Sequence, residues 1–267
     1  MNMEDTIPQP PPTEETQPKS RRPYAIILAV LLIAMLIVSL VLVFPFLATL
    51  SNGQLVSSDW SGFIVASDLA DPQPVVTGIN GSWIVPTVNV SASDAYSAVW
   101  IGIGGQYDDS LIQIGTEQDS LKGQAVYTTW YELFPENPET LNSPNITQQD
   151  HITASIILIN PTSNTWSIQI QDTTNGQTFQ KNPTYPSSRL SAEWIVERPT
   201  VGIRIGTLAN FGRVTFTQCT TTINGATGTI NAFPNHTVTM VNRQNINLVH
   251  VSSLTSTGSS FTVDYLP

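Results

Sequence analysis

Short runs of alternating apolar and polar residues make up most of the chain after residue 58. These runs are rich in Val, Ile, Thr, Trp and Tyr, which favour strands, and turn pairs such as Asn-Gly, Asp-Pro and Ser-Pro separate them. The predicted strands lie at residues 81–88, 97–105, 110–115, 125–134, 151–159, 165–172, 190–197, 213–220, 236–242 and 260–266. No stretch in this part has a helical apolar period, so the pattern predicts a single all-β domain, a sandwich or a barrel.

The N-terminal part has a different pattern. Residues 1–24 are rich in Pro, Thr, Gln and Glu without apolar periodicity, which predicts a disordered tail. Residues 25–44 are twenty residues without a charge, so we predict a transmembrane helix, a signal anchor, over residues 25–47. A cleaved signal peptide, whose apolar core is usually about 7–15 residues, is the alternative and implies a secreted protein. Residues 48–58 are then a short linker, and residues 59–267 form the β domain.

The charges on either side of the apolar segment predict its orientation. Lys19, Arg21 and Arg22 precede the segment, and the next basic residue is Lys122. By the positive-inside rule the tail is cytoplasmic, the protein lies in the cell membrane as a single-pass protein, and its C-terminal domain is extracellular.

The composition limits the kinds of partner and environment that we expect for the domain. The net charge is −10, with 20 acidic and 10 basic residues, and no basic cluster follows the apolar segment, which argues against nucleic acid as a partner. With so few bases the domain gains little self-repulsion when its carboxylates protonate, so we hypothesise adaptation to acid. Cys219 is the only cysteine, so the domain has no internal disulfide. Four sequons predict a glycoprotein if the host glycosylates, at Asn80, Asn89, Asn145 and Asn235.

Most familiar catalytic motifs are missing from the sequence. The histidines at 151, 236 and 250 form no metal-binding motif, and the sequence predicts neither a metal nor a cofactor. There is no Gly-x-Ser-x-Gly elbow, although serine chemistry with a distant histidine stays open. The glycines of "WIGIGG" lead into more strand instead of a helix, which argues against a phosphate loop. Carboxyl and amide side chains on strands are left as candidates.

Two strands carry such candidates. Gln113 in "SLIQIG" lies on the opposite face from its two isoleucine neighbours, and from this segment alone a solvent-facing glutamine is the simpler interpretation. In "TTWYELF", Trp130, Glu132 and Phe134 share one face. An acid between two aromatic residues is unusual for a plain core, although a surface acid remains the simpler interpretation of Glu132 as well.

The stretch "SAEWIVERP" holds two glutamates, Glu193 and Glu197, four residues apart. On a strand they share a face at a separation of about 13 Å. The carboxyl pairs of glycosidases lie about 5–9.5 Å apart, so these two glutamates are not such a pair. A helix would make them neighbours, but the β-rich context argues against one. A cross-strand pair of Glu132 and Glu197 keeps a glycoside hydrolase open as an alternative.

Five segments in order resemble the glutamic peptidases, or eqolisins, of the peptidase A4/G1 family: "DWSGFIV", "VWIGIGG", "LIQIGTEQ", "TWYELFPE" and "AEWIVERP". The resemblance covers roughly residues 60–267. It implies an acid-acting endopeptidase on a sandwich of two antiparallel sheets, concanavalin/lectin-like, that needs no metal or cofactor and takes protein or peptide substrates. With the predicted anchor, the chain resembles a membrane-anchored prokaryotic-type member. We expect a monomer.

The resemblance also implies roles for particular residues. Its motifs place the catalytic glutamine at Gln113 and the catalytic glutamate at Glu197, and Trp60, Trp130 and Glu132 would support the site and bind substrate. Glu197, as a carboxylate, would take a proton from the attacking water and return it to the leaving amine, while Gln113 stabilises the oxyanion. Glu193 is left with a structural or rim role.

The chain departs from the family pattern at two positions. Gly104 and Thr128 stand where members commonly have aspartate, which leaves the pH optimum open. A non-catalytic or carbohydrate-binding sandwich that keeps the fold also stays open as an alternative.

Overall fold

The computed structural model describes residues 48–49 and 54–267. Within these ranges no helix is long and apolar enough to cross a membrane. The tail predicted at residues 1–24 and the span predicted at residues 25–47 lie outside the described residues. The segment predicted as a linker holds the short strands β1 (Ala48–Thr49) and β2 (Leu55–Ser57), which pair with each other.

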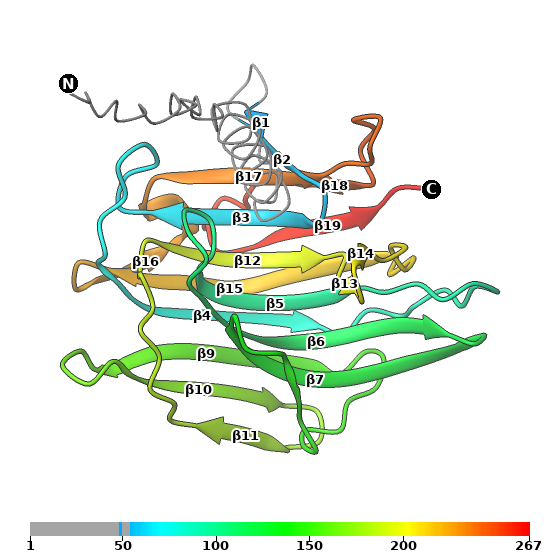
Figure 1. Ribbon diagram of the computed structural model, residues 1–267, viewed down its shortest axis with the longest axis horizontal. Helices are drawn as coiled ribbons and strands as arrows, with labels where there is room; N and C mark the ends of the chain where they lie inside the picture. Colours follow the sequence, from blue (N-terminus) through cyan, green and yellow to red (C-terminus); the bar gives the residue numbers. More distant parts are fainter. Residues whose placement is uncertain (1–47, 50–53) are drawn as a thin grey trace, which may run out of the picture. The chain divides into compact units, whose positions relative to one another are not determined.

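Two sheets form the domain, as Figure 1 shows. In spatial order the nine-stranded sheet contains β1, β2, β17 (Asn235–Met240), β3 (Trp60–Ala66), β12 (Ser191–Glu197), β5 (Ala98–Gly104), β6 (Leu111–Leu121), β7 (Gln124–Phe134) and β8 (Glu139–Thr140). The eight-stranded sheet contains β11 (Thr178–Lys181), β10 (Thr165–Asp172), β9 (His151–Asn160), β4 (Val76–Ile84), β15 (Arg213–Ile223), β19 (Phe261–Tyr265) and β18 (Val249–Val251), with β16 (Ala226–Thr229) against β15. A separate hairpin contains β13 (Thr200–Val201) and β14 (Arg204–Ile205), and the one helical turn in the described part is η1 (Ile230–Ala232).

The pairing confirms the predicted antiparallel sandwich. All paired neighbours within the two sheets are antiparallel except β17 and β2, which run parallel. Strand β12 of the first sheet packs over β4 and β15 of the second. Each of the ten predicted strands overlaps an observed one.

The strand alternation explains the main core. In β10 the side chains of Trp166, Ile168 and Ile170 are fully buried between the sheets, while the residues between them are partly exposed. Strand β5 is buried on both faces, because aromatic and aliphatic side chains also cover the outer face of its sheet. This smaller outer cluster contains Leu55, Ile64, Ala98, Trp100, Leu111, Trp130, Ile195 and Val238.

Strand β4 differs most from its predicted position at residues 81–88, because it begins at Val76 and ends at Ile84. The pair Asn80-Gly81, which resembles a turn signal, lies inside this strand. A side chain at Gly81 would come within 2.9 Å of the Trp194 ring, and the Nε1–H of Trp194 donates to the Asn80 carbonyl at 2.8 Å. The glycine therefore makes room for a tryptophan from the opposite sheet. Asn80 is half-buried here, as is the sequon residue Asn235, whereas Asn89 and Asn145 are exposed.

Candidate active site

The outer face of the nine-stranded sheet collects the residues expected to form the site. In β12 the side chains of Ala192, Trp194 and Val196 enter the core between the sheets, so Glu193 and Glu197 project from the other face. The same alternation in β5, β6 and β7 brings further side chains to this outer face. The strand assignment of β12 confirms that Glu193 and Glu197 lie four strand residues apart.

The register of the four strands arranges this face in three cross-strand rows. From β12 to β7 the rows are Glu193–Gly102–Gln113–Glu132, Ile195–Trp100–Gly115–Trp130 and Glu197–Ala98–Glu117–Thr128. Gln113 lies in the first row and Glu197 in the third, on either side of the middle row. Among the described residues no hydrogen bond joins these two side chains. A ligand that touches both must therefore lie over the middle row, where Gly115 has no side chain.

Gln113 is only 5 % exposed, so the solvent-facing position that its own segment favours is wrong. Its Nε2 donates a hydrogen bond to Oε2 of Glu132, and its Oε1 is buried without a partner in the described structure. An amide nitrogen carries two hydrogens, so one N–H remains for a ligand. Burial raises the pKa of Glu132, and the hydrogen bond from Gln113 opposes this effect. Glu132 is thus a partner that orients the amide of Gln113.

Trp100 is a site residue that the sequence does not single out. Its Nε1–H donates to Oε2 of Glu197 at 2.7 Å, and the ring of Trp60 packs edge-on against it with 5.0 Å between ring centroids. A side chain at Gly102 would come within 2.9 Å of Trp100 Cζ3. The indole therefore extends from the Gly102 row to the Glu197 row. The only sequence signal for Trp100 is its place in "VWIGIGG", a segment in which the glycines are the more conspicuous residues.

The surroundings of Glu197 make its carboxyl a weak acid. Burial, followed by the charges of Asp59, Glu132 and Glu117, raises the pKa of Glu197 to about 8, although the hydrogen bond from Trp100 opposes the shift. The charge of Glu132, which accepts the hydrogen bond from Gln113, thus acts on the carboxyl of Glu197. Glu197 is therefore protonated in acid, which differs from the expectation that it acts there as a carboxylate.

Glu117 is a second residue that sequence reasoning missed, although it lies only four positions after Gln113. Burial raises its pKa, and it accepts a hydrogen bond from Thr128 Oγ1 at 3.2 Å. Thr128 thus donates to an acid of the same row.

Glu193 has a structural position, and the rim role considered for it is wrong. Its side chain is fully buried, and neither carboxyl oxygen has a hydrogen-bond partner in the part of the chain that the structure describes. Burial raises the pKa of Glu193 well above its usual value, with Ser191 opposing the shift, so the neutral form of this side chain is favoured.

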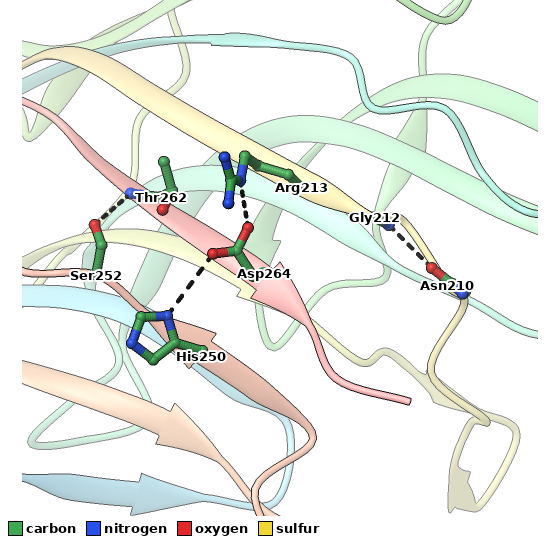
Figure 2. Close-up of polar contacts among 7 residues, drawn as sticks. All are labelled: Asn210, Gly212, Arg213, His250, Ser252, Thr262 and Asp264. Atoms are coloured by element: carbon green, nitrogen blue, oxygen red, sulfur yellow. Dashed lines mark hydrogen bonds and ion pairs between the residues drawn. The ribbon is translucent and has the colours of Figure 1, made fainter.

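The structure gives less support to metal-dependent or serine-based catalysis. The described residues contain no group of three or more His, Cys, Asp or Glu side chains that could hold a metal ion. Figure 2 shows His250 near Asp264, with 3.7 Å between Nδ1 and Oδ2. The nearby Ser252 Oγ instead accepts a hydrogen bond from the Thr262 N–H at 2.9 Å. The hydroxyl of Ser252 in turn donates to the Ser253 carbonyl at 3.0 Å, so it is not directed at His250 as a serine–histidine pair requires.

Fold and face together define a class of protein: a two-sheet antiparallel sandwich that presents a buried glutamine and several carboxyl groups on one sheet face. A model of the peptidase A4 family matches residues 58–265, and the chain belongs to this family.

Individual relatives are more distant. The chain is 28 % identical over 195 residues to aspergillopepsin-2 of Aspergillus niger, which covers 64 % of this chain and 66 % of that protein. It is 28 % identical over 158 residues to scytalidopepsin B of Scytalidium lignicola, covering 57 % of this chain and 56 % of the relative. The chain thus spans less than two thirds of the length of these curated relatives. A solved structure of scytalido-glutamic peptidase with a transition state analog inhibitor has a TM-score of 0.66 at 22 % identity, covering 78 % of this chain and 98 % of that one, which shows the shared fold.

Proposed function

We propose that the protein is a glutamic endopeptidase that hydrolyses peptide bonds in proteins or peptides, with Glu197 and Gln113 as its catalytic residues. Membership of the peptidase A4 family supports the reaction class, and the solved structure with the same fold is that of a scytalido-glutamic peptidase. The observation that carries the residue assignment is the shared face. It holds Glu197 against Trp100 and holds Gln113 against Glu132, on either side of the row that contains Gly115.

The protonated form of Glu197 accounts for both halves of the reaction. One carboxyl oxygen accepts a proton from the attacking water while the hydroxyl gives its proton to the leaving nitrogen, so the carboxylic acid is regenerated. The bond from the water oxygen to the carbonyl carbon forms, and the C–N bond breaks. The remaining N–H of Gln113 donates to the oxygen on which negative charge develops. A glutamine does not titrate, so this donor keeps its role at every pH.

Tryptophans supply the walls of the proposed cleft. Trp60 packs on Trp100 beside Glu197, and Trp130 lies beside Gly115 in the middle row. The Nε1–H of Trp130 is buried and has no hydrogen-bond partner among the described residues, so it is available to a backbone carbonyl of a bound peptide. Substrate binding by Trp60 and Trp130 and positioning of Gln113 by Glu132 complete the proposal.

The proposed working range is acidic. A carboxyl with a pKa of about 8 holds its proton at pH 2–5, and the reaction above requires that proton. Activity should then decline as the pH rises through this pKa. Gly104 and Thr128, at the two positions where the family resemblance leads us to expect aspartate, carry no charge, and Glu197 and Gln113 are both present.

We also propose that the domain acts outside the cell as a membrane-anchored monomer. The uncharged segment at residues 25–44 and the three basic residues before it support this location. Addition of a membrane-impermeant protease to intact cells should digest the domain and spare the N-terminal tail. Protection of the domain would contradict the proposed orientation.

The function can be tested with four matched proteins. The purified wild type is incubated with a denatured protein at pH 2–5 beside Glu197→Gln, Gln113→Ala and Glu193→Gln. We expect cleavage by the wild type and by Glu193→Gln, and a loss of about 100-fold or more in Glu197→Gln and Gln113→Ala. Equal activity of Glu197→Gln and wild type would refute the assignment. Loss in Glu193→Gln alone would place the catalytic acid in the first row.

A further inference from the structure

A cavity of about 830 Å³ lies at the ends of the strands, beyond the Glu197 row. It is lined by the end of β2 and the residue after it, by the β13–β14 hairpin and by the loop that follows β17. Three arginines reach it from separate segments: Arg198, which directly follows Glu197, Arg204 in β14, and Arg243 in the loop. We call this cavity the arginine pocket.

The arginine pocket concentrates charge that is scarce elsewhere. The whole chain has ten basic residues, and three of them precede residue 25, so seven remain in the domain. Three of these seven line one cavity, and its described lining contains no Asp or Glu. Elsewhere Lys181 pairs with Glu139. Figure 2 shows that Arg213 pairs with Asp264. In a protein of net charge −10, this pocket is a local positive site.

Arg198 retains unused hydrogen-bonding capacity. Its Nη2 donates to the Ser58 carbonyl at 2.6 Å, but its Nε–H is buried without a partner in the described structure. Burial lowers the pKa of Arg198, the charge of Asp59 opposes this effect, and the smaller effect of the Arg243 charge lowers the pKa further. The two arginines therefore repel each other. An anion between the two arginines would relieve this repulsion and accept a hydrogen bond from the Nε–H of Arg198.

The chemistry of the lining identifies the ligand class. Guanidinium groups present parallel N–H donors that match the two oxygens of a carboxylate or phosphate. Apolar side chains adjoin the guanidinium groups, since Ile203, Ile205 and Leu208 also line the pocket. Ile203 is 94 % exposed, so it is accessible to a ligand. We propose that the arginine pocket is a binding site for an oxyanion, a carboxylate or a phosphate, carried by a small ligand or by a peptide.

The peptide is the favoured source of this oxyanion, and this choice rests on the proposed peptidase function. Arg198 directly follows Glu197, so a peptide that lies over the active face with its C-terminus toward this end of the strands would bring its free carboxylate close to the pocket. Inorganic phosphate is the alternative source of the same chemistry.

The test compares three probes by titration calorimetry on the full chain at about pH 5.5, where a terminal carboxylate is ionised. The probes are N-acetyl-trialanine with a free C-terminus, the same peptide as its amide, and inorganic phosphate. All titrations use the Glu197→Gln background, so that binding is measured without cleavage. The double variant Arg204→Gln/Arg243→Gln removes two pocket charges, and Lys122→Gln removes one exposed charge outside the pocket as the matched control.

We expect the free acid to bind roughly tenfold or more tightly than the amide. This difference should disappear in the double arginine variant and persist in Lys122→Gln. Phosphate binding that needs the two arginines, without discrimination between acid and amide, would assign the site to a free anion. Equal binding of all probes by the double variant and its background would overturn the oxyanion site.

The outcome is separable from the fate of the proposed function. The titrations need no catalysis, so they remain informative if the protein cleaves no peptide. If the protein does cleave peptides, cleavage of a substrate with an amidated C-terminus should be unchanged in Arg204→Gln/Arg243→Gln. A loss there would show that the arginines act through the active face and not through a separate pocket.

Discussion

Replacement of Trp100 by phenylalanine should shift the pH dependence of activity. The variant keeps an aromatic ring on the outer face but removes the Nε1–H that donates to Glu197 at 2.7 Å. A hydrogen bond to a charged group contributes about 1.5–3 kcal/mol, which corresponds to about 1–2 pKa units. This bond favours the carboxylate, so its loss should raise the pKa of Glu197 from about 8 to about 9–10.

The assay is the pH profile of kcat/KM, which reports the pKa of the free enzyme. If protonated Glu197 is the active form, the descending limb of the Trp100→Phe profile should move about 1–2 pH units upward. Trp166→Phe is the matched control, because it also removes a buried indole N–H, which donates to the Tyr185 carbonyl at 2.9 Å, but in the other sheet. A folded Trp100→Phe protein whose limb coincides with that of the wild type would refute the reasoning.

Three further predictions concern the same face. Glu193→Gln should leave stability at pH 4 nearly unchanged and raise it at pH 7. Folded Glu193 keeps a proton that the unfolded chain releases above about pH 4.3, so this group costs about 1.4 kcal/mol of stability per pH unit as the pH rises. Urea unfolding of both proteins at both pH values checks this prediction. A wild type that gains stability from this group at pH 7 would contradict it. Glu132→Gln should move the descending limb of kcat/KM to lower pH, because the charge of Glu132 raises the pKa of Glu197; an upward shift would be inconsistent with that coupling. Gly115→Ala should lower stability by about 1–3 kcal/mol and reduce kcat/KM, because its Cβ would come within 2.6 Å of Trp100 Cβ; a variant as stable and active as wild type in thermal unfolding and cleavage assays would show that the β5–β6 spacing is not needed.

The strands follow from sequence because their cause is local. The alternation in residues 190–197 predicts a strand, and β12 (Ser191–Glu197) confirms it together with the wide separation of Glu193 and Glu197. At Asn80-Gly81 the pair is typical of a turn, but β4 continues through it, because a tryptophan from the opposite sheet takes the space beside the glycine. Turn chemistry was overridden there by packing between sheets.

The site depends on register and on burial, which single segments do not contain. Gln113 is buried because Trp100, Trp130 and other side chains cover the outer face, although its own segment favours an exposed residue. Burial is the main cause of the raised pKa of Glu197, and the charges of Asp59, Glu132 and Glu117, which come from three other parts of the chain, add to it. The arginine pocket likewise joins residues 198, 204 and 243, which no motif connects.

The pH profile of kcat/KM for peptide cleavage from pH 2 to 9 by wild type and Glu197→Gln tests the central claim most directly. Wild-type activity should be high in acid and fall with the loss of one proton near pH 8, the pKa of Glu197. Glu197→Gln should have residual activity at least about 100-fold lower and no such limb. A wild-type activity that rises through this pH, or a Glu197→Gln profile that matches the wild type, would contradict the role of protonated Glu197.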